Sequence, residues 1–242
     1  MRIALSVACF DDALFPDTGR AVTVLLERLG HEVVFPPGQT CCGQIHWAAG
    51  YHREAAGLAR AYAAAFEGGD VVVAPSASCA AAVRADYPRI ARAARDPGLA
   101  RAAEGLAVYE LTEFLVDVLG VTDVGAYFPH RVTYHPSCRS LRSLEVGDRP
   151  LRLLRAVKGL DLVELPAAEE CCGFGGAFAM KNADVSVAMV ADKIRHVRGT
   201  GADVVCAVDD SCLAHIGGAL SRLRAGVRTM HLAEILAATG AS

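Results

Sequence analysis

The sequence predicts an α/β protein built from two tandem repeats, each a mostly parallel sheet covered by helices. Short runs rich in Val, Ile and Leu alternate with segments whose apolar residues recur at helical spacing. This alternation occurs twice, and a length of 242 residues is enough for two domains. With 53% hydrophobic and 21% charged residues, the composition excludes a disordered chain.

The repeat is clearest in the cysteines. RIALSVACF matches RVTYHPSCR, HEVVFPP matches LDLVELP, and DVVVAPSASC matches DVVCAVDDSC. Four cysteines recur 129, 130, 130 and 133 residues later: Cys9 as Cys138, Cys41 as Cys171, Cys42 as Cys172, and Cys79 as Cys212. So coherent a shift predicts two domains, residues 1–125 and 126–242, with the boundary near residues 120–129.

In the first half, the apolar run MRIALSVACF predicts a strand that leads to the first cysteine. Residues 20–29 have helical apolar spacing and end at Gly30, which predicts a helix. HEVVFPP and DVVVAPSASC predict the second and third strands, with an Ala-rich helix over residues 55–66 between them. GLAVYELTEFL supplies a last strand and helix.

The second half follows the same order. Asp148 is a candidate cap for a helix that Pro150 opens, that runs to Lys158 and that Gly159 stops. A further helix is predicted over residues 184–198, with Asp184 as N-cap and Gly199 as its stop. Each half is therefore predicted to run β-α-β-α-β-α-β-α, a Rossmann-like arrangement.

Charge and hydropathy exclude several classes of protein. The net charge is −3 with only 24 Lys and Arg residues, so the sequence lacks the excess of basic residues that is typical of nucleic-acid-binding proteins. No window holds the ~18 uninterrupted apolar residues that a transmembrane segment needs. The first apolar run is too short for a signal peptide and is followed by no cleavage site, so we expect a cytoplasmic protein. In a reducing compartment, nine cysteines indicate metal ligands or catalytic thiols more than disulfides.

The predicted strands bring four of these cysteines together in each half. Cys9 and Cys138 lie at the ends of first strands, the two Cys-Cys-Gly sequences follow second strands, and Cys79 and Cys212 follow third strands. Because the carboxyl ends of parallel strands meet at one sheet edge, four sulfurs converge per half. Four thiolates suit a [4Fe–4S] cluster or structural zinc. The long spacings and adjacent cysteine pairs favour a cluster, with zinc and catalytic or packing thiols as alternatives.

Other residues have more than one interpretation. Cys206 lies inside a predicted strand, without a counterpart, and is expected to pack as a small hydrophobe. Gly43, Gly173, Gly175 and Gly176 are candidate cofactor-binding residues, because glycine lets amide N–H groups point at cluster sulfurs. No Walker lysine follows them, which argues against a phosphate loop.

Nearby histidines and one lysine are candidates for contact with a cluster. His46, His135 and His215 lie three or four residues from a cysteine and can donate a hydrogen bond to sulfide or relay protons; otherwise they are capping or partly exposed residues. Lys181 is the cation that the sequence places nearest the second Cys-Cys-Gly motif, with a solvated helix residue as the alternative.

Several motifs resemble the cysteine-rich CCG domains of the lactate utilization protein A (LutA/YkgE) family. They are GQTCCGQ, TYHPSC, ECCGFGG, and SCLAHIGG followed by HLAEIL. Such domains also occur in one subunit of heterodisulfide reductase and in the iron–sulfur subunit of glycolate oxidase. The resemblance covers the whole chain. It implies an iron–sulfur electron-transfer subunit, not catalytic alone, of a LutABC-type complex that oxidises L-lactate to pyruvate. The implied partners are an iron–sulfur protein and a LutC-like protein.

The resemblance has one departure. The wider CCG pattern ends in C-x-x-C, and this chain has Ser76 and Asp209 in place of the first of those cysteines. Four thiols per half predict one ordinary [4Fe–4S] cluster per repeat, although one site could instead hold zinc or a non-cubane cluster, and an oxygen ligand from either residue stays open. The alternatives are a heterodisulfide-reductase-like protein, a subunit for another 2-hydroxyacid such as glycolate, and a zinc-binding protein without redox activity.

Overall fold

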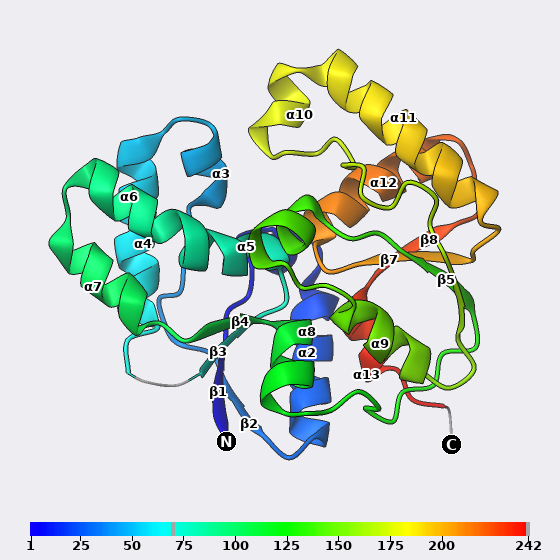
Figure 1. Ribbon diagram of the computed structural model, residues 1–242, viewed down its shortest axis with the longest axis horizontal. Coiled ribbons are helices and arrows are strands. Elements are labelled where there is room, and N and C mark those ends of the chain that lie inside the picture. The colour runs from blue at the N-terminus through cyan, green and yellow to red at the C-terminus, as the bar shows by residue number, and fades with distance from the viewer. Residues whose placement is uncertain (69–70, 241–242) are drawn as a thin grey trace.

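The computed structural model describes residues 1–68 and 71–240, and within these ranges the strands form two four-stranded, all-parallel sheets (Figure 1). The first sheet has the order β2-β1-β3-β4 and the second the order β6-β5-β7-β8. The strands are β1 (Arg2–Leu5), β2 (Glu32–Val34), β3 (Val71–Ala74), β4 (Val108–Glu110), β5 (Arg131–Tyr134), β6 (Asp161–Val163), β7 (Val204–Ala207) and β8 (Arg228–His231). The predicted α/β class and the tandem Rossmann-like repeats are confirmed, with sheets that are entirely parallel.

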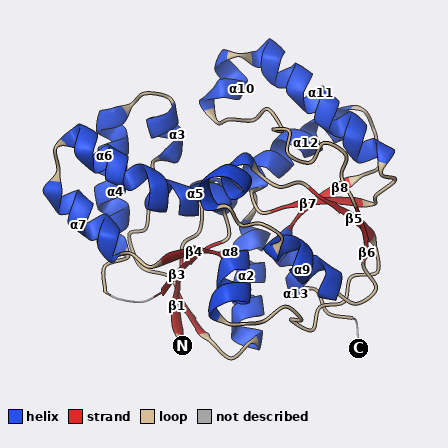
Figure 2. Cartoon of the chain, in the orientation of Figure 1, coloured by secondary structure: helices blue, strands red, loops and turns tan. Residues whose placement is uncertain are grey.

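Helices cover both sheets (Figure 2). Those of the first half are α1 (Cys9–Leu14), α2 (Pro16–Arg28), α3 (Gln44–Ala48), α4 (His52–Ala65), α5 (Ala77–Ala81), α6 (Tyr87–Ala94), α7 (Pro97–Gly105) and α8 (Leu111–Glu113), with π-helical turns η1 (Ala82–Asp86) and η2 (Phe114–Val118). Those of the second half are α9 (Arg149–Ala156), α10 (Ala177–Lys181), α11 (Ala183–Gly199), α12 (Asp210–Arg222) and α13 (Leu232–Ala237), with π-helical turn η3 (Ser140–Leu144).

The central strands are apolar because helices bury both of their faces. In β1 and β3, Ile3 pairs with Val71, and in β5 and β7, Val132 pairs with Val204. Every residue of β7 is buried, including Cys206. Near-continuous apolar strands of this kind are typical of parallel sheets. The location of Cys206 agrees with its predicted role in packing.

Three predicted helix boundaries differ from the structure. The first long helix, α2, begins at Pro16, four residues before the predicted start, because proline occupies its first position without needing a hydrogen bond. Asp148 precedes α9, but its side chain makes no capping hydrogen bond, and α9 ends at Ala156. Asp184 lies inside the first turn of α11; Asn182 is at the N-cap position, and the helix includes Gly199.

The two halves pack closely against each other. Helix α13 of the second half contacts α2 of the first (Figure 1). Arg28 of α2 donates a hydrogen bond to the carbonyl oxygen of Ala237 at 3.0 Å. One hydrophobic cluster includes residues of both sheets, such as Val72 and Val204. The division at residues 125 and 126 stays a prediction.

The same packing brings the carboxyl ends of the two sheets together. Helix α1 contacts α12, and α5 contacts η3. All four segments follow the carboxyl end of a strand. The loops that carry the cysteines of both repeats therefore meet at the junction between the halves.

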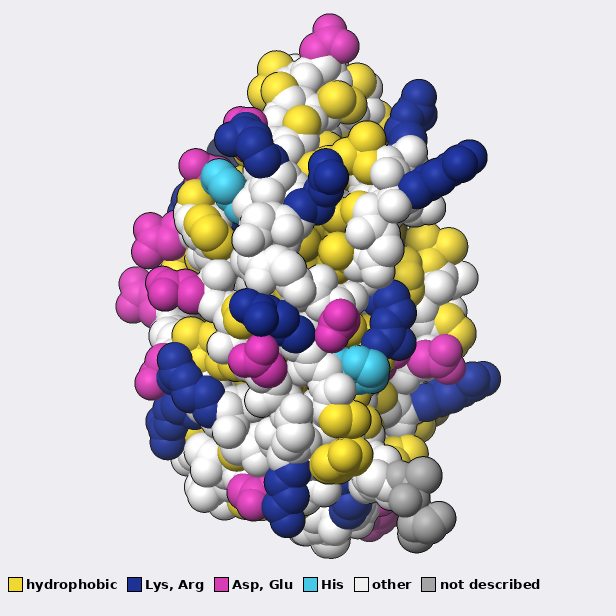
Figure 3. All heavy atoms as spheres, turned by 90° about the vertical axis from the view of Figure 1, so that its right-hand side faces the viewer, with side chains coloured by type: hydrophobic (Ala, Val, Ile, Leu, Met, Phe, Trp, Pro, Cys, Tyr) yellow, Lys and Arg dark blue, Asp and Glu magenta, His cyan; other side chains and the backbone are white. Residues whose placement is uncertain are grey.

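The outer surface has mixed character. On the face seen in Figure 3, basic and acidic side chains alternate, with hydrophobic side chains between them. Among the described residues, no helix is long and apolar enough to cross a membrane.

Candidate metal centres

The four matched thiols of the first repeat lie in contact as a group. Cys9 is the first residue of α1, Cys41 and Cys42 follow β2, and Cys79 lies in α5. The Sγ atoms of Cys42 and Cys79 are 3.4 Å apart. Cys41 is in hydrogen-bond contact with both Cys9 and Cys42. Cys42 and Cys79 are buried, whereas Cys9 and Cys41 reach the surface, so the group has an inner and an outer side.

The second repeat reproduces this arrangement. Cys171 is in hydrogen-bond contact with Cys138 and Cys172, and Cys172 with Cys212. Cys172 and Cys212 are buried, and Cys138 and Cys171 are partly exposed. All eight cysteines that the repeat predicted are therefore placed together, four in each half, and all are free thiols. We call these groups the first and second cysteine sets.

Backbone amides point at one sulfur in each set. The N–H of Gly43 donates to Sγ of Cys41 at 3.4 Å, and that of Gly173 donates to Sγ of Cys171 at 3.3 Å. Both glycines have positive φ, 81° and 89°. A Cβ on Gly173 would lie 2.7 Å from the carbonyl oxygen of Ser186, so only glycine fits there. Cofactor binding by the two glycines stays a prediction.

Each set favours one thiolate. Hydrogen bonds from Cys42 and then Cys9 lower the pKa of Cys41 to about 2. Hydrogen bonds from Cys138 and Cys172 lower the pKa of Cys171 to about 2 in the same way. The pKa values of the neighbouring thiols are raised by these same bonds. Because metal ions bind thiolates, each set has a sulfur ready to begin binding.

The two sets line one cavity of about 140 Å³. Phe10 and Phe174 also line it, with ring centroids 5.8 Å apart in an edge-to-face arrangement. Ile45 of α3 faces Gly176, which precedes α10, and a Cβ on Gly176 would lie 3.5 Å from the Ile45 side chain. Gly175 and Gly176 therefore line the cavity between the repeats, beside the sulfurs of both sets.

The two positions that depart from the wider cysteine pattern contact each other. Ser76 Oγ donates to Asp209 Oδ1 at 2.7 Å and accepts the amide N–H of Cys79 at 3.2 Å. Asp209 Oδ1 also accepts the N–H of Ser78 at 3.0 Å. The Ser76 hydroxyl is thus occupied within the protein.

The histidines differ in their contacts. His135 is 1% exposed, and one of its ring nitrogens lies within 4.8 Å of the Sγ atoms of Cys172 and Cys212. His46 acts electrostatically on Cys41. His215 Nε2 lies 3.1 Å from Ser186 Oγ, next to the second Cys-Cys-Gly loop. All three predicted histidines are near a cysteine set, and His135 is the most buried.

A buried cation that interacts electrostatically with the second set is Lys193, which sequence reasoning missed. Lys181 is exposed, with its Nζ 5.6 Å from the centre of the Tyr51 ring, which agrees with the alternative interpretation of a solvated helix residue. Lys193, on α11, is fully buried; burial lowers the pKa of its ammonium group, and the nearby Glu170 and thiols of the second set oppose this change. The only sequence signal was its apolar surroundings in VAMVADKIRHV.

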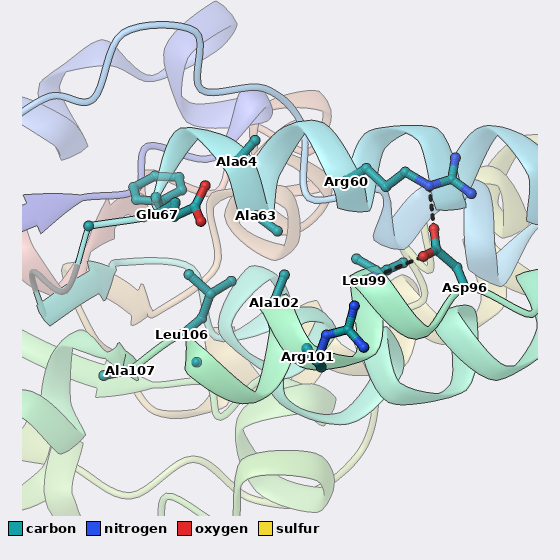
Figure 4. Close-up of a pocket in the computed structure, with 14 residues that line it drawn as sticks. Arg60, Ala63, Ala64, Glu67, Asp96, Leu99, Arg101, Ala102, Leu106 and Ala107 are labelled. Atoms are coloured by element: carbon teal, nitrogen blue, oxygen red, sulfur yellow. Dashed lines mark hydrogen bonds and ion pairs between the residues drawn. The ribbon is translucent and has the colours of Figure 1, made fainter.

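A larger cavity, of about 460 Å³, lies away from the cysteines between α4 and α7 (Figure 4). Two of its charged residues, Arg60 and Asp96, make contacts within the fold. Arg60 Nε pairs with Asp96 Oδ2 at 2.5 Å, and Asp96 Oδ1 accepts the N–H of Leu99 at the start of α7. No cysteine lines this cavity, so the cysteine sets are the better candidate site.

Comparison with known proteins agrees with this choice of site. The family profile named CCG, a cysteine-rich domain, matches residues 3–84 and 132–217, one copy per repeat. The chain is 46% identical over 238 residues to lactate utilization protein A of Oceanobacillus iheyensis, an alignment that covers 98% of this chain and 96% of that protein. Its identity to lactate utilization protein A of Geobacillus kaustophilus is 48%, covering 98% of each. The chain belongs to the lactate utilization protein A family.

The fold also resembles a solved structure. A hypothetical protein from Helicobacter pylori matches with a TM-score of 0.58 and 13% sequence identity. The match covers 100% of this chain and 49% of that one, so this member of the family spans about half the length of that structure. At this identity the likeness concerns the fold alone. The cysteine-rich domain and the clustered thiols together suggest metal binding.

Proposed function

We propose that this chain is an iron–sulfur electron-transfer subunit of a cytoplasmic complex that oxidises L-lactate to pyruvate. The observation that supports it most is the clustering of eight free thiols into two matched sets beside one cavity. Relatives named lactate utilization protein A, at 46% and 48% identity over nearly the whole chain, support a role in the use of lactate.

The thiol sets suit iron–sulfur clusters better than zinc. Structural zinc sites usually draw ligands from short C-x₂₋₄-C sequences, whereas here the ligands are adjacent pairs and distant single cysteines. Amide N–H groups directed at Cys41 and Cys171 are typical of cluster sites, where hydrogen bonds to sulfur tune the potential. We propose one [4Fe–4S] cluster per set, held by the four cysteines of that set.

The protein itself supplies the ligands and their electrostatic surroundings. Oxidation of L-lactate to pyruvate releases two electrons and two protons, and the clusters would accept the electrons one at a time. We propose that the carbon chemistry depends on companion subunits, an iron–sulfur protein and a LutC-like protein, because no flavin or nicotinamide motif occurs in the chain. This chain would then not be catalytic alone.

The decisive experiment is metal analysis of protein purified without oxygen. We expect iron and acid-labile sulfide in equal amounts, corresponding to two clusters per chain, and paramagnetic signals on reduction. Cys41→Ser and Cys171→Ser should each remove about half of the iron. Cys206→Ala, which changes a buried cysteine outside both sets, is the matched control and should keep the full amount. Zinc without sulfide would contradict the proposal.

The partnership is tested separately. L-lactate-dependent reduction of a dye should require the companion subunits together with this chain, and Cys171→Ser should abolish it. Glycolate in place of L-lactate tests the alternative substrate. A chain that reduces the dye alone would contradict the assignment as a dependent subunit.

A further inference from the structure

A buried polar pair lies beneath each cysteine set, at equivalent positions of the two repeats. Ser6 directly follows β1, and its N–H donates to the carbonyl oxygen of Val73 on β3 at 2.9 Å. His135 directly follows β5, and its N–H donates to the carbonyl oxygen of Cys206 on β7 at 2.7 Å. Ser6 and His135 therefore occupy the same structural position.

The second members of the pairs are Tyr62 and Lys193. In the first repeat, Ala55 of α4 approaches Gly43, and Tyr62 lies seven residues after Ala55. In the second repeat, Ser186 of α11 makes the same approach to Gly173, and Lys193 lies seven residues after Ser186. Seven residues are about two helical turns, so Tyr62 and Lys193 project from the same face of matching helices.

In the first repeat the pair, Ser6 and Tyr62, is neutral, and its two side chains are hydrogen-bonded to each other. The hydroxyl of Tyr62 donates to Ser6 Oγ at 2.7 Å, and both side chains are buried. A phenol and an alcohol bonded to each other present no net charge to the first cysteine set.

In the second repeat the pair, Lys193 and His135, includes a cation, and the two side chains are not hydrogen-bonded to each other. Lys193 is 0% exposed; its Nζ donates to the carbonyl oxygens of Ala167 and Ala168, at 2.9 Å and 3.3 Å, in the loop that leads to Cys171. His135 is 1% exposed, and neither of its ring nitrogens has a hydrogen-bond partner among the described residues. Since buried polar groups nearly always find a partner, His135 has a donor to offer to a ligand held by Cys172 and Cys212.

Neighbouring acids do not cancel this difference. Glu170, the acid that acts most strongly on Lys193, has a side chain 56% exposed, where water screens its charge. Asp209 is hydrogen-bonded to Ser76 of the first repeat and acts on Cys138 of the second, so it lies between the two sets. Lys193 is therefore a buried cation of the second repeat whose place in the first repeat is taken by the neutral Tyr62.

We infer that the second cysteine set holds the centre of higher reduction potential, and that Lys193 and His135 make it the electron acceptor of the pair. Reduction adds one negative charge to a centre, which a buried ammonium and an N–H donor to sulfur stabilise. In the transfer, one electron leaves the reduced first centre, which becomes oxidised, and reduces the second; no bond to carbon or hydrogen changes. The inference rests on the proposed iron–sulfur function, and it adds a direction of electron flow and the residues that set it.

The test is a redox titration of the anaerobically purified full chain, followed by electron paramagnetic resonance. Signals are assigned with Cys41→Ser, which retains the second centre, and Cys171→Ser, which retains the first. We expect the second midpoint potential to be the higher. Lys193→Met should shift the electron partition between the centres at least tenfold toward the first, about 59 mV for a one-electron couple, by lowering the second midpoint alone.

Matched variants separate charge from structure. Lys193→Arg keeps the charge and should keep most of the second midpoint. Tyr62→Phe, at the equivalent position of the first repeat, removes a hydroxyl without changing charge and should leave the second midpoint unchanged. His135→Phe removes the donor and should also lower the second midpoint; this variant provides the measurement if Lys193→Met fails to load its second centre.

The outcomes distinguish this inference from the proposed function. A wild-type chain without iron and sulfide overturns both. A chain that holds two clusters, but in which the first midpoint is the higher, overturns the inference and leaves the proposed function standing. The same holds if Lys193→Met and His135→Phe both leave the second midpoint where it was.

Discussion

Ser76 Oγ and Asp209 Oδ1 are joined by a 2.7 Å hydrogen bond that connects the two repeats. Both side chains are buried, and each stands three residues before the last cysteine of its set. Ser76 also caps α5 by accepting the N–H of Cys79. The Ser76 hydroxyl and Asp209 Oδ1 are therefore occupied by contacts between the repeats, whereas Asp209 Oδ2 is buried without a hydrogen-bond partner among the described residues.

Replacement of Ser76 by alanine should weaken the fold and leave the metal content unchanged. The variant loses an N-cap and a buried hydrogen bond, which together cost about 1–3 kcal/mol. We expect a lower denaturant midpoint, followed by circular dichroism, with the same iron per chain as the wild type. Asp96→Ala, which removes the N-cap of α7 away from the cysteines, is the matched control. Loss of iron in Ser76→Ala, but not in Asp96→Ala, would show that Ser76 is a ligand.

Alanine at Gly173 should be more damaging than alanine at Gly43. Both positions have positive φ, which costs an L-residue about 1–2 kcal/mol. At Gly173 the new Cβ would also lie 2.7 Å from a backbone oxygen, against 3.2 Å at Gly43, and overpacking of this kind adds about 1–3 kcal/mol. Urea unfolding of both variants measures the difference.

The control for the glycine variants is Gly218→Ala. Gly218 lies inside α12 with no atom within 4 Å of its missing Cβ, so alanine should stabilise the helix by about 0.5–1 kcal/mol. Equal losses at Gly43 and Gly173 would show that the close approach to Ser186 does not matter.

Much of the fold was predictable because the pattern of apolar runs and cysteines occurs twice in the sequence. Strands such as VVVA and VVCA are short, apolar and placed directly before a cysteine motif, so both their type and their order follow from the repeat. Helix ends were less predictable. Asp148 and Asp184 are common capping residues, but in the structure neither side chain makes a capping bond, because the cap depends on backbone geometry that sequence spacing does not fix.

The cysteines of the candidate site were predictable from the sequence, and the residues around them were less so. Adjacent cysteines and parallel strands suffice to place four thiols at the edge of each sheet, whereas the meeting of both sets at one cavity follows from the packing of the two halves. The electrostatic partners come from tertiary packing. Lys181 is near the motif in sequence yet exposed, whereas Lys193 lies further along α11 and binds the carbonyl oxygens of Ala167 and Ala168 in the loop that leads to Cys171. In the sequence alone, only the apolar residues around Lys193 distinguish it from a solvated helical lysine.

The ion pair between Arg139 and Asp86 should couple the two repeats. Arg139 follows Cys138, Asp86 belongs to η1 of the first repeat, and their side chains are 22% and 4% exposed. Because the pair is largely buried, we expect a coupling energy of about 1–3 kcal/mol in a double-mutant cycle with Arg139→Gln and Asp86→Asn. The exposed pair of Arg20 and Asp17 is the control and should show no measurable coupling. A coupling near zero at Arg139 would mean that the nearby Arg89 replaces it.

Glu110 should make the stability of the protein fall as the pH rises. Its carboxyl is fully buried, and burial raises its pKa from 4.5 to about 8. The folded state therefore holds a proton that the unfolded state releases at lower pH. This contribution is fully present below pH 4.5 and is lost as the pH rises through about 8.

Glu110→Gln tests this pH dependence, because glutamine keeps the acceptor for the N–H of Thr112 and does not titrate. Urea unfolding between pH 5 and pH 8 should show a wild type that loses stability relative to the variant, with the gap widening at each step. The exposed Glu104→Gln should instead follow the wild type throughout. Parallel curves for Glu110→Gln and the wild type would show that Glu110 is ionised in the fold, with its charge held by the N–H groups of Thr112 and Glu113.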